Sequence, residues 1–295
     1  MCASRPHLFK HMRPVHLVLA SLCCALLATS GCSLLDAKQR EWIFQPTERS
    51  WHGADTSGME DVWIDFDSRL SGDAVRLHAL WLPSENANAP VLLYLHGARW
   101  NVSGSSQRIR RMQSLGFSVL AVDYRGFGQS SAGLPSEKMA IEDARAAWDW
   151  LAQQYPQKPR YLFGHSLGGA IAIALASEVD DEQGTLVEGT FTRMSDVLAS
   201  MRWGWLPVGP LLTQTFDSQK RVAQIGSPLL VVHGSGDRLI PPALGEQLYA
   251  AAQGPKRWVL VEGGSHHNTN SVGLPQYRMA LEDLFHLPAA SPPAR

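Results

Sequence analysis

The sequence predicts an α/β fold in which a mostly parallel central sheet of about eight strands carries helices on both faces. Two observations support this prediction. Short, continuously apolar runs alternate with segments of helical spacing, which is typical of a parallel sheet buried on both sides. In addition, the apolar run 161–163 leads through a glycine-rich turn into a segment of small residues, as a strand–turn–helix unit does.

Composition is consistent with one globular domain. The chain has 295 residues, of which 45% are hydrophobic and 18% are charged, so a sizeable core is expected. The formal net charge of -1 gives no electrostatic reason for binding nucleic acid. The cysteines and histidines do not form a metal-ligand pattern, and we expect no metal and no organic cofactor.

The N-terminus has the organisation of a secretory signal. Arg5, Lys10 and Arg13 precede an apolar run over residues 17–28, and small residues follow up to Cys32. The run is shorter than the roughly 20 residues that a membrane-spanning helix needs. We therefore expect residues 1–31 to be a signal peptide, with either Met1 or Met12 as its start.

The end of this signal resembles a bacterial lipobox. In Ser30-Gly31-Cys32 the cysteine would be lipidated and become the new N-terminus, although Thr29 stands where leucine is usual. The resemblance implies a lipid-anchored protein of the bacterial cell envelope that faces the periplasm. Ser33 after the cysteine indicates the outer membrane. The alternative is a soluble periplasmic protein with an incidental cysteine.

All four cysteines lie within the first 32 residues, so cleavage before Cys32 would leave no internal disulfide. Residues 32–58 are mixed and polar, which indicates a tether and lead-in. The globular domain is expected over residues 59–288, and residues 289–295 are expected to be disordered.

Strands are expected where apolar residues alternate or run continuously. The first two form a hairpin across Ser71–Asp73. Helices are expected over residues 137–151, with Ser136 as N-cap, and over residues 170–176, 243–252 and 276–285. The predicted strands are 61–67, 75–81, 91–95, 117–122, 161–163, 185–188, 229–232 and 258–261.

The turn Gly164-His165-Ser166-Leu167-Gly168-Gly169 is the most informative motif. Glycines flank the serine because the backbone turns there too sharply for nearby side chains. Such a nucleophile elbow presents the serine hydroxyl at the start of a helix, whose free N–H groups can receive an oxyanion. We predict that Ser166 is a nucleophile.

A serine nucleophile needs a base and a carboxylate that orients the base. Asp237 follows the apolar run 229–232, and His266 lies in the loop after the last strand. The order Ser, Asp, His along the chain is that expected for this kind of fold. His267 is the alternative base. Asp123, which also follows a strand, is expected to bind backbone in its own turn or, less favourably, to replace Asp237.

Two backbone N–H groups are expected to form the oxyanion hole. One belongs to Leu167, directly after the nucleophile, and the other to Ala98, in the loop after His96-Gly97. His96 is expected to brace this loop. His165 is expected to pack or to line the rim of the site.

The motifs together resemble the alpha/beta-hydrolase superfamily over roughly residues 60–285. They are most similar to its bud-emergence-type branch of membrane-associated serine hydrolases. Ala98 and His267 stand where that branch usually has asparagine, and the alignment of Gly264-Ser265-His266 supports His266 as base. The motifs are Leu95-His96-Gly97, Asp123 to Gly128, Phe163 to Gly169, Glu188 to Phe191 and Gly264 to His266.

The resemblance implies a small cap between Phe191 and Gln219. This segment is either a helix pair packed on the sheet or a lid that lines an acyl pocket, for which Trp203, Trp205 and Leu206 are the candidate residues. A small cap would leave the site open to bulky or lipidic esters.

We therefore expect a serine hydrolase that cleaves small-molecule or lipidic carboxylic esters or thioesters through an acyl-enzyme on Ser166. Two alternatives stay open at this point. One is a serine peptidase or amidase, and the other is a catalytically silent lipid-binding envelope lipoprotein. The expected partners are the ester substrate and the membrane, through the lipid on Cys32, with no nucleic acid.

Overall fold

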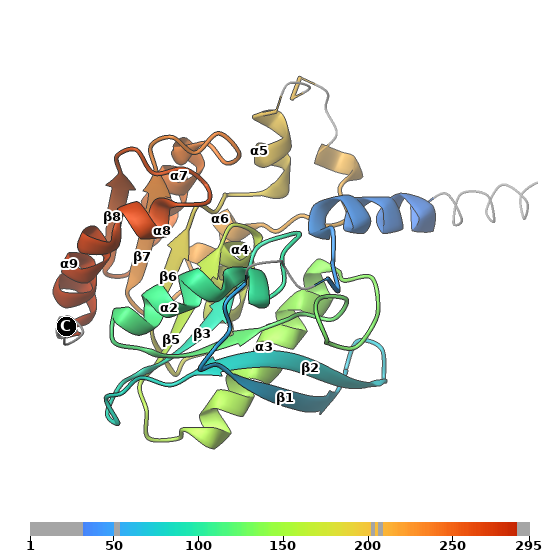
Figure 1. The fold of residues 1–295 in the computed structure, drawn as a ribbon. Helices are drawn as coiled ribbons and strands as arrows, with labels where there is room; N and C mark the ends of the chain where they lie inside the picture. The colour runs from blue at the N-terminus through green and yellow to red at the C-terminus, as the bar shows by residue number, and fades with distance from the viewer. Residues whose placement is uncertain (1–31, 50–53, 202–203, 206–208, 288–295) are drawn as a thin grey trace, which may run out of the picture.

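The computed structural model of the protein describes residues 32–49, 54–201, 204–205 and 209–287. They contain an eight-stranded sheet with the strand order β1-β2-β4-β3-β5-β6-β7-β8 (Figure 1). β1 and β2 form an antiparallel pair, β2 is antiparallel to β4, and the strands from β4 to β8 run parallel. The strands are β1 (Glu60–Asp67), β2 (Ala74–Leu82), β3 (Val91–Leu95), β4 (Ser118–Val122), β5 (Arg160–His165), β6 (Glu182–Glu188), β7 (Leu229–Gly234) and β8 (Lys256–Val261).

The predicted fold class is confirmed, since each of the predicted strands overlaps an observed one. β3 has the predicted bounds, and the other strand ends differ from the prediction by at most three residues. The agreement has a physical cause in the burial of the strands. Alternate side chains of β3 enter two different cores, with Leu93 in one and Tyr94 in the other, so the whole strand is apolar.

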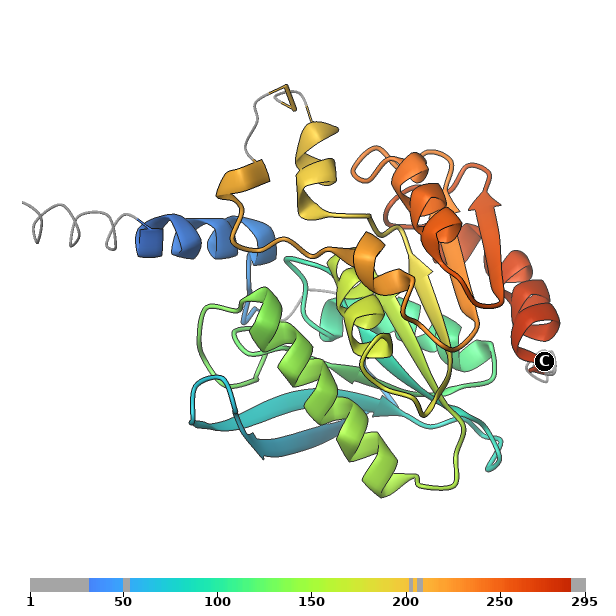
Figure 2. The ribbon, with the colours of Figure 1, turned by 180° about the vertical axis from the view of Figure 1, so that it is seen from behind.

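Helices cover both faces of the sheet (Figures 1 and 2). One core contains buried side chains of α3, α4, α6 and α7, and the other contains buried side chains of α2 and α9. The helices of the described residues, besides one over residues 32–44, are α2 (Ser106–Ser114), α3 (Glu137–Gln154), α4 (Leu167–Ala176), α5 (Met194–Ala199), α6 (Ser218–Val222), α7 (Pro242–Ala251), α8 (Thr269–Val272) and α9 (Leu274–Phe285), with the 3-10 helices η1 (Ser103–Ser105) and η2 (Gly209–Leu211).

The segment for which the sequence predicts a tether contains the helix over residues 32–44. Its last two residues, Ile43 and Phe44, are buried, and Arg40 donates hydrogen bonds to the carbonyls of Leu134 and Pro135. Gln39 donates to the carbonyl of Leu211, so the helix lies beside η2 (Figure 1). The polar side chains of this helix bind other loops of the protein. Because these contacts need polar residues, the composition of the segment is like that of a tether.

Helix α2 is not among the helices that the sequence pattern predicts. Its buried apolar side chains are Ile109 and Met112, too few for a clear helical period, and the remaining residues are Ser, Gln and Arg. Between Phe191 and Gln219, where a small cap is expected, the described residues form the short helices α5 and η2 and the first residues of α6. The predicted signal peptide (1–31) and the predicted disordered tail (289–295) lie outside the described residues.

No helix in the part of the chain that the structure describes has both the length and the apolar character needed to cross a membrane.

Close backbone packing gives a first prediction. A Cβ on Gly168 of α4 would lie 2.1 Å from the carbonyl oxygen of Leu95, whereas a Cβ on Gly226 would meet nothing within 4 Å. We expect Gly168→Ala to lower the free energy of unfolding by at least about 2 kcal/mol, because backbone has to move, and Gly226→Ala to change it by less than about 0.5 kcal/mol. Urea denaturation of the two variants measures the difference, and equal stabilities would contradict the packing described.

Candidate active site

The turn between β5 and α4 places Ser166 at the carboxyl edge of the sheet. Its backbone angles, φ 57° and ψ -121°, are strained for a residue with a side chain. A Cβ on Gly164 would lie 2.2 Å from the carbonyl oxygen of Gly168, so strand and helix approach closely only with glycine there. The strained turn exposes the hydroxyl that the sequence predicts as nucleophile.

Hydrogen bonds from the neighbouring strand hold this turn. The N–H of Ser166 donates to the carbonyl of Glu188 at 2.9 Å, and the hydroxyl of Thr190 donates to the carbonyl of Ser166 at 2.9 Å. Both partners belong to the end of β6 or follow it, next to β5 in the sheet. The strained backbone is therefore fixed from one side by β6 and from the other by the packing of α4.

Three predicted side chains meet at this edge from three different loops. Oγ of Ser166 lies 3.0 Å from Nε2 of His266, and Nδ1 of His266 lies 2.7 Å from Oδ2 of Asp237. An ionised carboxylate only accepts hydrogen bonds, so Nδ1 carries the proton and Nε2 presents a lone pair to the serine hydroxyl. The structure thus brings His266, and not the alternative His267, to Ser166.

Asp237 is buried, and hydrogen-bond donors surround its carboxylate. Its Oδ1 accepts the N–H groups of Leu239 and Ile240, both at 2.9 Å, and Nε2 of His233 lies 3.4 Å from its Oδ2. Burial raises the pKa of Asp237, but the hydrogen bonds of His233 and His266 outweigh burial and lower the pKa below its usual value. Asp237 is therefore ionised at neutral pH.

The segments that carry the two predicted oxyanion donors adjoin Ser166. Leu167 is the first residue of α4, and its N–H is one of those that have no acceptor within the helix. The loop that carries Ala98 passes directly beside the serine, since a Cβ on Gly97 would lie 3.2 Å from Cβ of Ser166.

His96 fixes the orientation of this loop. Its Nδ1 donates to the carbonyl of Gly97 at 2.7 Å. Because the peptide unit is planar and trans, fixing the Gly97 carbonyl also fixes the Ala98 N–H in the opposite direction. The brace that the sequence predicts for His96 therefore has a specific effect, which is to orient one candidate oxyanion donor.

Asp123 supports the same loop. Its Oδ1 accepts the N–H of Val102 at 2.8 Å and lies 3.3 Å from Nε2 of His96. Asp123 thus binds a backbone N–H, as predicted, but the prediction of its partner was wrong. The bound N–H belongs to the loop after β3 and not to the turn of Asp123 itself. Asp123 is not the acid partner of His266, whose Nδ1 contacts Asp237.

His165 packs against the loop that carries His266, called the histidine loop below, and does not line the rim of the site. Its side chain is buried, and its Nε2 donates to the carbonyl of His266 at 2.9 Å. Burial and the positive charge of Arg108 hold the pKa of His165 well below its usual value. His165 is therefore a neutral donor to the loop that carries His266.

His267, the alternative base, has another contact. Its ring stacks on that of Trp100, with centroids 6.1 Å apart.

A buried ionic group beneath the site was not predicted. Glu188 is fully buried, and its carboxylate accepts hydrogen bonds from Arg108 and from the hydroxyl of Tyr277. In the sequence, Glu188 is recognised only as a member of the motif Glu188 to Phe191. Nothing there indicates that it contacts Arg108 and Tyr277, which lie 80 and 89 positions away. His233, beside Asp237, was missed because it lies inside an apolar strand.

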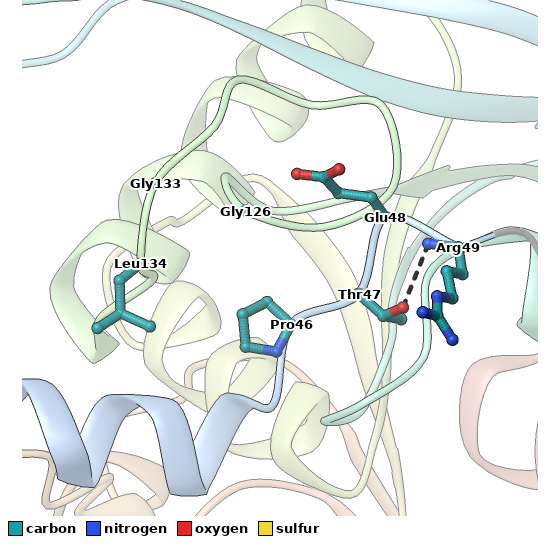
Figure 3. Close-up of a pocket in the computed structure, with 7 residues that line it drawn as sticks. All are labelled: Pro46, Thr47, Glu48, Arg49, Gly126, Gly133 and Leu134. Carbon is teal, nitrogen blue, oxygen red and sulfur yellow. Dashed lines mark hydrogen bonds between the residues drawn. The ribbon is translucent and has the colours of Figure 1, made fainter.

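The candidate acyl pocket is not defined by the described residues. Trp205 is 74% exposed, while Trp203 and Leu206 lie outside the described residues. A shallow cavity of about 430 Å³ lies elsewhere, between residues 46–49 and the loop from Gly126 to Leu134, and no triad residue lines it (Figure 3). Within the described ranges, no group of three His, Cys, Asp or Glu side chains could hold a metal ion.

The buried, neutral state of His165 predicts a pH dependence of stability. In the unfolded chain this histidine has its ordinary pKa, near 6.5, and binds a proton that the folded state excludes. Stability is therefore lost as the pH falls below that value, by up to about 1.4 kcal/mol per pH unit from this group. We expect His165→Gln to flatten the pH dependence of urea denaturation between about pH 7 and 5. An unchanged slope would show that His165 binds the proton in the folded state as well.

Comparison with known proteins agrees with this geometry. The model of a family described as serine aminopeptidase, S33, matches residues 86–208. An uncharacterized protein of Mycobacterium tuberculosis is 32% identical over 249 residues, which cover 83% of this chain and 86% of that protein. The lysophosphatidylserine lipase ABHD12 of Danio rerio is 31% identical over 211 residues, which cover 65% of this chain and 55% of the lipase.

Among solved structures, the esterase Pf2001 of Pyrococcus furiosus has the same fold. The TM-score is 0.64 at 22% sequence identity, and the match covers 82% of this chain and 97% of the esterase. The identity to the Mycobacterium tuberculosis protein extends over most of both chains, and the sheet, the turn at Ser166 and the family match agree with one another. The chain belongs to the α/β-hydrolase superfamily.

Proposed function

We propose that the protein is a serine hydrolase that cleaves carboxylic esters or thioesters through an acyl-enzyme on Ser166. One observation carries the proposal, namely the hydrogen-bonded line from Asp237 through His266 to Ser166, with distances of 2.7 and 3.0 Å. A carboxylate that stays ionised orients a histidine, and the histidine accepts the proton of a hydroxyl held in a strained turn. This arrangement turns a weakly nucleophilic serine into a reactive one.

The proposed reaction has two halves. Oγ of Ser166 attacks the acyl carbon while its proton moves to Nε2 of His266, and the carbonyl oxygen becomes an oxyanion. The intermediate expels the alcohol or thiol, which takes the proton from His266, and Ser166 is left acylated. Water then attacks the acyl carbon and gives a proton to His266, which returns it to Ser166 as the acid leaves.

The remaining groups stabilise charge during these steps. The N–H groups of Leu167 and Ala98 would receive the oxyanion, and one such donor is typically worth about 3 kcal/mol in the transition state. Asp237 would stay ionised and stabilise the imidazolium of His266. His96 would act through Ala98, because it fixes the peptide that carries the second donor.

The description of the matching family, serine aminopeptidase, raises a peptidase as the alternative function. An aminopeptidase needs acidic groups to hold the charged amino terminus of its substrate. Two carboxylates at the site are already engaged, Asp237 with His266 and Glu188 with Arg108 and Tyr277. We therefore favour the ester over the peptide, and an aminoacyl p-nitroanilide is the substrate that assays the alternative.

A lipidic ester is the substrate class that we favour. The Danio rerio relative is named as a lysophosphatidylserine lipase, and the cap of this chain exposes Trp205 and Leu211 to solvent, at 74% and 61%. Exposed apolar side chains on the cap suit the acyl chain of a lipid. The motifs quoted above also support membership of the bud-emergence-type branch, which we propose.

Replacement of the nucleophile separates this proposal from that of a catalytically silent lipid-binding protein. We expect Ser166→Ala to lower kcat for p-nitrophenyl esters about 10⁴- to 10⁶-fold, because the triad acts as a unit. Binding of a non-hydrolysable ether lysophospholipid should survive the substitution.

Ser177→Ala is the matched control. Ser177 follows the last residue of α4, and its hydroxyl donates to the carbonyl of Ala174 in the same helix, so its replacement should leave kcat within twofold. A wild-type protein that binds the ether lipid but hydrolyses no ester would favour the silent binding protein instead.

We also propose that the protein is anchored through a lipid on Cys32, on the periplasmic side of a bacterial envelope and at its outer membrane. Cys32 is exposed and lies close in sequence to the exposed side chains of Leu34 and Leu35. These features support an attachment point at the membrane surface.

Metabolic labelling tests the anchor. With the full chain expressed in a Gram-negative bacterium, we expect an alkyne analogue of palmitate to label the wild type and Cys24→Ser but not Cys32→Ser. Cys24 lies in the segment that the signal cleavage would remove, so it serves as the control. Labelling that persists in Cys32→Ser would contradict the proposed attachment site.

A further inference from the structure

Glu188 is connected both to the nucleophile and to the loop that carries the base. Its backbone carbonyl accepts the N–H of Ser166 at 2.9 Å. Its carboxylate is fully buried, and Oε1 accepts Nε and Nη2 of Arg108 at 3.1 and 2.9 Å. The hydroxyl of Tyr277, in α9, donates to Oε2. One residue at the end of β6 therefore contacts the serine through its backbone and an arginine through its side chain.

Arg108 extends this connection to the histidine loop. Nη2, besides its contact with Glu188, donates to the carbonyl of His267 at 3.3 Å. The adjacent carbonyl, that of His266, accepts Nε2 of His165 at 2.9 Å. Two consecutive carbonyls of the loop are thus held by donors that are fixed next to Ser166. Both anchor points lie in the backbone directly after the Cα that carries the imidazole of His266.

The energetics favour a role in positioning. A buried ion pair contributes little net stability, because desolvation of both charges offsets their attraction, and apolar residues of similar size often replace it without loss. The planar guanidinium, in contrast, fixes the direction of several hydrogen bonds at once. The side chain of Arg108 is only 12% exposed and has its carboxylate partner fully buried, so the direction of Nη2 is well determined.

We propose that Arg108, oriented by Glu188, is a positioning residue that holds the His266 loop in register with Ser166. The proposal rests on the proposed hydrolase function and adds the residues that set the distance between nucleophile and base. A loop displaced by about 1 Å would lengthen the contact between Ser166 and His266, and misplacement of that size can cost about 100-fold in rate.

Arg108→Met alone would leave Glu188 charged, buried and without its arginine, and the variant could fail to fold for that reason. The double variant Arg108→Met/Glu188→Gln removes both charges and keeps similar volumes. The matched control is Arg110→Met, on the same helix, whose side chain bonds the carbonyls of Asp55 and Ser57 and no part of the histidine loop. All variants are first compared with wild type by thermal unfolding.

We expect the folded double variant to lose kcat for p-nitrophenyl esters about 10- to 100-fold, with KM within about threefold, because the chemical step depends on the alignment of His266. Arg110→Met should retain kcat within about twofold. A double variant that is folded and keeps kcat within twofold of wild type would overturn the proposal, as would a loss confined to Arg108→Met.

Proton NMR supplies a second readout that does not depend on turnover. The Nδ1 proton of His266, hydrogen-bonded to Asp237, should give a far-downfield signal in wild type and in Arg110→Met. This signal should shift or broaden in the double variant, and an unchanged signal would contradict the positioning role. If wild type shows the signal but hydrolyses nothing, the proposed function fails while the positioning of His266 is still measured.

Discussion

The close approach of β5 and α4 at the turn of Ser166 is the constraint on which the rest of the site depends. The approach requires glycine at 164 and 168, because a Cβ at either position would overlap backbone. It places the first N–H groups of α4 at the carboxyl edge of the sheet and brings the loop of Gly97 against the serine. A wider turn would move the hydroxyl away from His266 and separate the two candidate oxyanion donors.

Buried polar groups on both sides of that turn keep it in place. Asp237, after β7, orients the imidazole of His266. Glu188, at the end of β6, accepts the N–H of Ser166 with its backbone carbonyl and binds Arg108 with its carboxylate. Asp123 and His96 hold the loop after β3 in the same way. A buried charged group is tolerated only when donors surround it, so each of these carboxylates fixes several atoms around it. The charges of the site are therefore paired.

Most of the fold and the triad could be predicted from the sequence, because both are encoded locally. A parallel strand buried on both faces is a continuous apolar run, and the turn at Ser166 requires glycines at fixed positions. The partners of Glu188 could not be predicted, since Arg108 and Tyr277 reach it only after the chain has folded. The sequence predicts a tether instead of the helix over residues 32–44, because the contacts of this helix are polar and distant in the sequence, as between Gln39 and Leu211.

The central claim is that Ser166 is an activated nucleophile, and the most direct measurement is labelling of the protein with a fluorophosphonate, followed by mass spectrometry of the modified peptide. The structure predicts one covalent adduct, on Ser166, in the wild type and its loss in His266→Ala, because the hydroxyl then has no base. Folded wild-type protein that forms no adduct, or forms one equally well without His266, would contradict the account.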